Sequence, residues 1–219
     1  MNRFKSAGQI RNNQYFQGMG SRSLRRMWTE KLSSASGNIP SGKHQRITSA
    51  PTMQTFRGVA IGIDTSLRGT GIAIVNFSAA TPKLVFSTRI TCPPKLSFPQ
   101  CIEKIFAEMT AVVNNFQIDS AALEQTTYVQ NYKISHILGA AKGAVIVALT
   151  SKNLAISEYP PLRIKQSVTG VGRASKEQVR RTICNILNIQ HEISYDESDA
   201  IAIALCHAWT KKHAALNNF

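Results

Sequence analysis

The sequence predicts an α/β domain built on a mixed sheet, and the order of its apolar patterns is the reason. Three strand-like runs come first, joined by links short enough for an antiparallel meander. Two further runs alternate with helical patterns, and such alternation packs helices in layers on a sheet. The expected strands are 56–64, 70–77, 84–91, 120–124 and 154–159, and the expected helices are about 98–116, 131–151, 175–187 and 197–211.

The strand-like runs are short apolar stretches bounded by polar or turn-forming residues. The first run, "VAIGID", ends at Asp64; the chain then turns through polar residues and glycines and becomes apolar again at Ile72. This pattern predicts a hairpin. The fourth run, "SAALE", ends at Glu124. Two strands of the expected sheet therefore end on a carboxylate.

Two of the helical patterns carry further local signals. Ser175 and Gln178 stand three residues apart at the start of the third pattern, which is the spacing of a capping box. In the fourth pattern Ile201, Leu205 and Ala208 form an apolar stripe. We expect this stripe to pack the last helix onto the sheet.

Residues 1–55 differ in character from the rest of the chain. They hold nine Lys or Arg and one acid, Glu30, so they carry +8 of the formal net charge of +14. Their Ser, Asn, Gln and Gly content predicts a disordered extension that ends in a linker. The folded domain is expected at 56–212 and a short tail at 213–219.

Three interpretations of this extension are open. It is an organelle transit peptide, a flexible DNA-binding arm, or an upstream segment that is not translated, with Met53 as the true start. The expected compartment follows from the choice. It is the cytoplasm of a bacterium if translation begins at Met53, and a mitochondrion or plastid if the extension is a transit peptide.

Charge and cysteine usage limit the class of protein. A net charge of +14 favours a polyanionic partner, nucleic acid before a membrane surface. The four cysteines have no C-x-x-C spacing and are expected to be reduced thiols. The longest apolar run, Gly139 to Thr150, is interrupted by Lys142 and is shorter than the roughly 18 residues of a membrane span. We therefore expect no membrane partner.

Four carboxylates stand where elements of the expected fold begin or end. Asp64 and Glu124 end two strands, and Asp196 and Asp199 lie three residues apart near the start of the last helix. That spacing places both aspartates on one helix face. The helix dipole favours anions at this end. Strand ends at one edge of a sheet and a helix start packed over that edge can bring all four together.

A group of four carboxylates predicts a metal site. The negative charges repel one another and raise each other's pKa values, and a divalent cation removes that conflict. Oxygen ligands without Cys or His suit Mg²⁺ or Mn²⁺. Two such ions can hold a phosphate, supply a hydroxide for attack and stabilise the leaving oxygen. A basic protein with this site is a candidate nuclease.

Purely structural roles are the alternative. Asp64 is then a turn-former before Gly69, and Asp196 is a helix cap with Asp199 merely favourable in the first turn. These roles leave Glu124, the charge that closes an apolar strand, without an explanation. On spacing alone both interpretations stay open.

Four segments, taken in order, resemble the RuvC family of Holliday-junction resolvases in the RNase H-like superfamily. They are "IGIDTSLRGTGIAIV", "ALEQTTYVQN" with "LGAAKGAVIVAL", "SEYPPLRIKQSVTGVGRASKEQV" and "DESDAIAIALCHA". The resemblance runs from about Val59 to Trp209. It implies a mixed five-stranded sheet in the order 3-2-1-4-5 with helices on both faces.

The resemblance also implies a role for each acid. Asp64 corresponds to the acid that bridges two metal ions, Glu124 to the second ligand, and Asp196 and Asp199 to the acidic pair that completes the site. The implied cofactor is Mg²⁺, two ions per site, with Mn²⁺ as a substitute. The implied reaction is two-metal hydrolysis that resolves four-way DNA junctions by paired symmetric nicks in recombination and repair. The implied partners are a second copy of the chain and, by analogy, a branch-migration helicase complex.

Basic and aromatic residues complete the expected site. Lys165 and Lys176, eleven residues apart, match lysines that act near the scissile phosphate, where a positive charge stabilises the charge that builds up during attack. Without the resemblance both would be interpreted as solvated surface charges. Tyr128, Lys165, Arg173, Lys176 and Arg180 are the expected DNA contacts.

The chain departs from the family pattern at two places. Thr65 and Ser66 stand where the family commonly has Pro-Gly, which changes the turn but not the carboxylate. Thr127 stands where some relatives have a phenylalanine that stacks on an unpaired base. Its neighbour Tyr128 is the expected substitute, since an aromatic ring stacks on any base.

Two rival functions remain. One is an RNase H-like ribonuclease of the ribosomal-RNA maturation type, against which the segment from Lys165 to Lys176 and the context of Glu124 both argue. The other is a non-catalytic junction-binding protein with a decayed site, against which the presence of all four acids argues.

Overall fold

A computed structural model describes residues 56–126 and 131–210. The predicted extension at 1–55, the segment 127–130 with Thr127 and Tyr128, and the predicted tail lie outside the described residues. The strands are β1 (Val59–Asp64), β2 (Gly69–Asn76), β3 (Lys83–Thr91), β4 (Ser120–Glu124) and β5 (Ile156–Tyr159). The helices are α2 (Phe98–Asn115), α3 (Tyr132–Thr150), α4 (Pro161–Thr169), α5 (Lys176–Leu187) and α6 (Tyr195–Thr210).

The described strands form one mixed sheet in the order β3-β2-β1-β4-β5, which confirms the expected topology. β1, β2 and β3 pair as an antiparallel meander, whereas β4 lies parallel to β1 and β5 parallel to β4. In the β1–β4 ladder Ile63 is opposite Leu123. The next residues on these strands, Asp64 and Glu124, therefore lie side by side at the same edge of the sheet.

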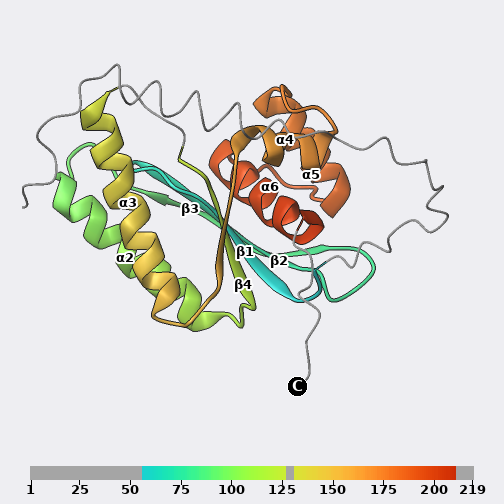
Figure 1. Cartoon of the computed structure of the whole chain (residues 1–219), viewed down its shortest axis with the longest axis horizontal. Helices are drawn as coiled ribbons and strands as arrows, with labels where there is room; N and C mark the ends of the chain where they lie inside the picture. The colour runs from blue at the N-terminus through green and yellow to red at the C-terminus, as the bar shows by residue number, and fades with distance from the viewer. Residues whose placement is uncertain (1–55, 127–130, 211–219) are drawn as a thin grey trace, which may run out of the picture. The chain divides into compact units, whose positions relative to one another are not determined.

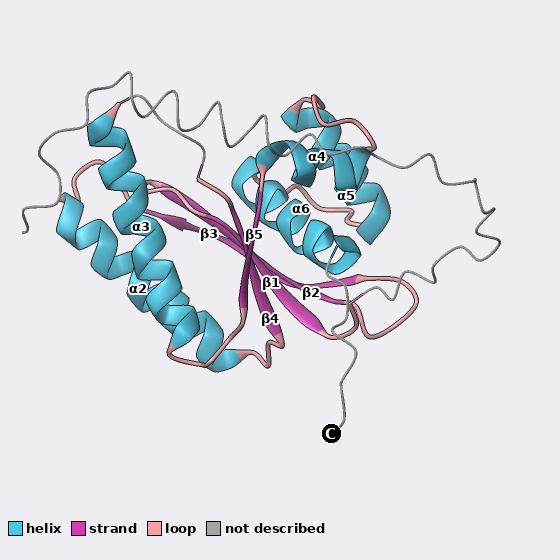
Figure 2. Cartoon of the chain, viewed as in Figure 1, coloured by secondary structure: helices cyan, strands magenta, loops and turns pink. Residues whose placement is uncertain are grey.

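Helices cover both faces of the sheet, as predicted (Figures 1 and 2). The larger side chains of β1 and β2, such as Ile61 and Ile72, pack in one apolar cluster with α2 and α3. The smaller ones, such as Ala60 and Ala73, pack in a second cluster with α4, α5 and α6. Because strand residues alternate between faces, Asp64 lies on the face of Ala60 and therefore on the side of α6.

Helix α3 is long and apolar enough, by length and composition, to cross a membrane. Its buried residues pack in the cluster that it shares with α2 and the sheet. One side of α3 thus packs in the layered domain, while Tyr132, Ile134 and Val147 are exposed.

Helix α6 packs unusually close to the sheet. A Cβ atom at Gly62 of β1 would overlap the carbonyl oxygen of Ala200, and one at Gly71 of β2 would overlap that of Asp196. The predicted stripe on α6 is buried, but Ser198 and residues 200–208 are also buried, because α4 and α5 cover the outer side of the helix. Glycines in the strands thus bring the first turn of α6 against the strand end that carries Asp64.

The structure corrects one element. The segment interpreted as a lysine-bearing loop contains helix α4, whose first residue is Pro161 and whose C-cap is Gly170 with φ of 77°. Proline at the first helical position costs no hydrogen bond, so here it starts a helix rather than breaking one. The predicted capping box of α5 is confirmed: Gln178 N donates to Ser175 Oγ (3.2 Å) and Ser175 N donates to Gln178 Oε1 (2.8 Å).

Candidate active site

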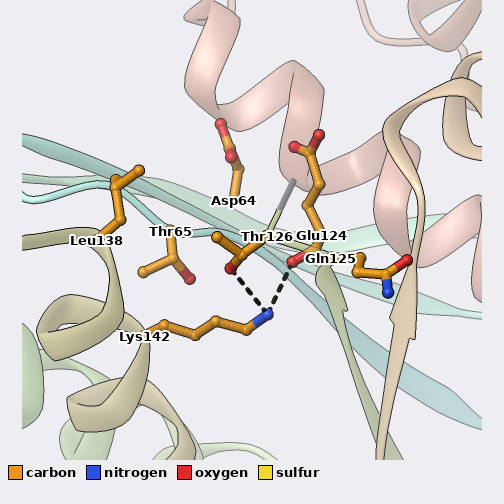
Figure 3. A pocket seen from close by; sticks show the side chains of 7 residues that line it. All are labelled: Asp64, Thr65, Glu124, Gln125, Thr126, Leu138 and Lys142. Atoms are coloured by element: carbon orange, nitrogen blue, oxygen red, sulfur yellow. Dashed lines mark hydrogen bonds between the residues drawn. The ribbon is translucent and has the colours of Figure 1, made fainter. Parts of the chain in front are cut away.

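Two carboxylates project from adjacent strand ends. Asp64 and Glu124 line one pocket together with Thr65, Gln125, Thr126, Leu138 and Lys142. Figure 3 shows both carboxyl groups directed to the same side, with Lys142 approaching from the other side. A second pocket contains Asp64 and Glu124 together with Asp199, Lys165 and Lys176. The strand ends and the start of α6 thus share one site.

Of the three acids at the start of α6, Glu197 takes part in capping the helix. Ser194 caps the helix: its Oγ accepts from Glu197 N (3.2 Å), and Glu197 Oε2 accepts from Ser194 N (3.0 Å) and Ser194 Oγ (2.8 Å). Glu197 also accepts from Ser87 Oγ (2.8 Å) on β3. Burial opposes ionisation, but these hydrogen bonds lower the pKa of Glu197. The capping role considered for Asp196 therefore belongs to Ser194 and Glu197.

Ser66 closes the turn after Asp64. Gly69 N donates to Ser66 Oγ (3.0 Å), and Thr70 Oγ1 donates to Ser66 O (2.6 Å). These bonds explain how the turn forms with Thr65 and Ser66 in place of Pro-Gly. The turn-forming role considered for Asp64 is therefore filled by Ser66.

The site has excess negative charge. Burial and then the charges of Asp199, Glu124 and Asp196 raise the pKa of Asp64 from 3.8 to about 7. Burial and Asp199 likewise raise the pKa of Glu124, against the opposing charges of Lys176, Lys165 and Lys142. Both shifts have the same two causes: burial disfavours the charged form of each carboxylate, and the neighbouring negative charges repel it.

Two basic side chains pair with the α6 acids. Lys176 Nζ donates to Asp199 Oδ2 (2.9 Å), and this bond raises the pKa of Lys176. Arg89 Nε lies 2.5 Å from Asp196 Oδ2. Within 56–126 and 131–210, no three His, Cys, Asp or Glu side chains converge tightly enough to hold an ion as they stand. Asp64, Glu124 and Asp199 line one pocket, whereas Asp196 is not in its lining and acts on Asp64 through its charge. Asp196 and Asp199 are each paired with a cation of the chain itself.

The remaining predicted contacts are placed as follows. Lys165 lies on α4 and lines the second pocket, and Arg173 is exposed and lines a groove with Arg181. Arg180 is engaged within the domain: its Nη2 lies 3.0 Å from Glu177 Oε2, and its guanidinium covers the ring of Tyr195 at 5.0 Å. Tyr128 lies outside the described residues.

Sequence reasoning missed Arg89 and Lys142. Lys142 on α3 donates to the carbonyl oxygen of Glu124 (3.2 Å), to Thr126 Oγ1 (3.3 Å) and to Glu158 Oε2 (2.8 Å). It therefore ties α3 to β4 and β5 beneath the site (Figure 3). A signal for it was present, since this lysine interrupts the apolar run from Gly139 to Thr150.

Replacing Lys142 by methionine is expected to lower the free energy of unfolding by about 1–3 kcal/mol, because Glu158 and the carbonyl of Glu124 lose their donor. Urea unfolding measures the change. Lys152→Met, the same substitution at an exposed position beyond α3, is the matched control and should change stability by less than about 0.5 kcal/mol. Equal stability of the two variants would contradict the tethering role.

Comparison with known proteins places the fold and site in one family. The crossover junction endodeoxyribonuclease RuvC family matches residues 60–207. RuvC of Bordetella petrii is 36% identical over 148 residues, covering 68% of this chain and 81% of the relative. RuvC of Ehrlichia ruminantium (strain Welgevonden) is 38% identical over 157 residues, covering 69% and 97%.

Solved structures agree with this placement. T. thermophilus RuvC in complex with a Holliday junction substrate superposes with a TM-score of 0.65 at 27% identity, covering 70% of this chain and 94% of that chain. The yeast mitochondrial Holliday junction resolvase Ydc2, at 9% identity and a TM-score of 0.52, shares the fold. Together with the sheet order and the grouped acids, these matches show that the chain belongs to the RuvC family.

Proposed function

We propose that this chain is a structure-selective DNA endonuclease that resolves four-way junctions by paired symmetric nicks. The observation that carries the proposal is the meeting of Asp64 and Glu124 with the acids of α6 at one edge of the sheet. The net charge of +14 suits a polyanionic substrate. Family membership and the named substrate of the T. thermophilus relative support the choice of a junction.

Divalent cations fit the donors of this site. The oxygen donors are carboxylates, and the raised pKa of Asp64 indicates that the grouped acids lack positive charge. We assign two Mg²⁺ ions to Asp64, Glu124, Asp196 and Asp199, with Mn²⁺ able to replace them. When bound, such ions hold the phosphate and lower the pKa of the attacking water. The rigid strand ends fix Asp64 and Glu124 for this task.

The lysines act on the substrate side of the site. Lys165 on α4 and Lys176 at the start of α5 line the same pocket as Asp64 and Glu124. Their ammonium groups are placed to stabilise the negative charge that builds up on the phosphate during attack. Because Lys176 is paired with Asp199 in this structure, a cation on Asp199 would leave the lysine to the phosphate.

A cleavage assay on the full chain tests the proposal. Its substrates are a synthetic mobile four-way junction, a linear duplex of the same sequence and an RNA–DNA hybrid, each in Mg²⁺. Paired symmetric nicks in the junction alone are the expected result. Cleavage of the hybrid instead would indicate a ribonuclease. Tight junction binding without nicks in Mg²⁺ or Mn²⁺ would indicate a binding protein.

Replacing Lys176 by glutamine is expected to slow cleavage of saturating junction by about a hundredfold, because one charge near the reacting phosphate is lost. Single-turnover kinetics measure the rate, and fluorescence anisotropy in Ca²⁺ measures junction affinity. Lys152→Gln removes the same charge at an exposed site away from the pocket and should retain the rate. An unchanged rate in Lys176→Gln would remove this lysine from the catalytic group.

A homodimer is proposed because two symmetric nicks require two active sites. Helix α3 leaves Tyr132 81%, Ile134 46% and Val147 55% exposed. Cβ atoms at Gly139 and Gly143 would meet open space, so these glycines are not needed for packing within the subunit. Light scattering of the full chain tests the dimer. The helicase partner, the compartment and the DNA contacts of Tyr128, Arg173 and Arg180 stay predictions.

A further inference from the structure

An ion pair spans the sheet edge and the start of α6. Arg89 lies on β3, opposite Gly71 in the ladder with β2. Its side chain reaches Asp196 in the first turn of α6, with Nε 2.5 Å from Oδ2. The Arg89 side chain is 45% exposed and that of Asp196 is 25% exposed. The pair is therefore accessible to solvent and to ions.

Two glycines of β2 leave space for this ion pair and for the backbone of Asp196. A Cβ atom at Gly69 would lie 2.6 Å from Arg89 Nη2, 2.8 Å from Arg89 Nε and 2.8 Å from Asp196 Oδ2. One at Gly71 would overlap the backbone carbonyl of Asp196. Glycine at 69 thus leaves room for the paired side chains. Glycine at 71 lets the backbone of Asp196 pack directly against β2.

The chemistry of arginine makes this pair different from the one between Lys176 and Asp199. A guanidinium presents its N–H donors in a fixed plane that matches a carboxylate, whereas the ammonium of lysine acts as a point charge. A divalent cation competes directly, because it offers twice the charge to the same oxygen. A cation that binds Asp196 through Oδ2 must therefore displace Arg89 from that oxygen.

We propose that Arg89 is a built-in counter-ion that competes with the divalent metal for Asp196 and so sets the metal concentration at which the site loads. This inference rests on the proposed function, in which Asp196 is a metal ligand. Arg89 neutralises Asp196 when metal is scarce, and a bound metal releases the guanidinium. Because Arg89 touches the ligand and not the reacting phosphate, it is a positioning residue.

Mn²⁺ binding to the full chain without DNA, followed by calorimetry, tests the proposal. Arg89→Gln should tighten binding by about two- to fivefold, the range expected when one partly exposed ion pair no longer competes. Lys83→Gln removes the same charge at the far end of β3 and controls for net charge; it should change affinity by less than about twofold. Arg89→Lys, which keeps the charge, should lie between wild type and Arg89→Gln.

A double-mutant cycle makes the assignment specific. In an Asp196→Asn background, Arg89→Gln should no longer tighten Mn²⁺ binding, because the carboxylate that Arg89 occupies is gone. If Arg89→Gln binds Mn²⁺ no more tightly than wild type, the inference is overturned. If Asp64→Asn still weakens Mn²⁺ binding in that case, the proposed function stays intact. If wild type and Asp64→Asn bind Mn²⁺ equally, the metal site itself fails, and the role of Arg89 fails with it.

Discussion

Replacing Asp64 by asparagine is expected to reduce junction cleavage by about a thousandfold or more, the scale on which single essential groups act. The substitution keeps the shape of the side chain and removes its charge. The negative charges of the other three acids, Asp199, Glu124 and Asp196, all raise the pKa of Asp64. In the proposed site, loss of this carboxylate would therefore weaken the binding of both metal ions.

Single-turnover cleavage at saturating protein measures this loss, and anisotropy in Ca²⁺ measures junction binding. Binding should stay within about threefold of wild type, because phosphate contacts come from lysines and arginines rather than from this carboxylate. Glu103→Gln, an exposed acid on α2, is the control for charge and should retain cleavage. Substantial cleavage by Asp64→Asn would show that another group organises the reaction.

The acids at the site could be found from the sequence because each lies at the end of a pattern. Asp64 and Glu124 interrupt apolar strands at their last residue, and strand pairing makes them neighbours. The two aspartates of α6 follow the helical repeat. Glu197, which stands between them, could be told apart only once Ser194 and Ser87 were placed, because its role depends on hydrogen bonds.

Helix α4 was missed for a local reason. Consecutive prolines at 160 and 161 are typical of a loop, yet the second is the first residue of the helix and the first is its N-cap. The apolar stripe of α4 consists of only two buried residues, Ile164 and Val168, which is too short to stand out in the sequence. Lys165 therefore lies on a helix, whereas the sequence had indicated a loop at this position.

Contacts between elements were beyond the sequence. Arg89 and Lys142 each reach a residue far away along the chain, and neither belongs to a spacing pattern. The close approach of α6 depends on Gly62 and Gly71, for which the sequence indicated only a place in the first strand and in the turn that follows it. Their role in packing becomes visible only when the position of α6 on the sheet is known. Topology and side-chain reach, rather than local propensity, place the cations around the four acids.

Asp64→Asn, which should strongly reduce cleavage, should also stabilise the metal-free protein. An acid whose folded pKa is raised holds its proton longer in the folded state than in the unfolded state. Between about pH 4 and pH 7 the folded state therefore binds more protons, and stability falls as pH rises through this window. For Asp64 the shift from 3.8 to about 7 corresponds to at most about 4 kcal/mol at pH 8.

Solvent exposure of the site reduces this figure, so Asp64→Asn is expected to gain about 2–3 kcal/mol at pH 8 in EDTA and little at pH 4. Urea unfolding at both pH values measures the gain, with Glu103→Gln as the control that should show none. Adding Mn²⁺ should stabilise wild type more than the variant, because only the folded wild-type site binds the ion fully. A variant no more stable than wild type at pH 8 would show that burial and the neighbouring carboxylates do not oppose the ionisation of Asp64.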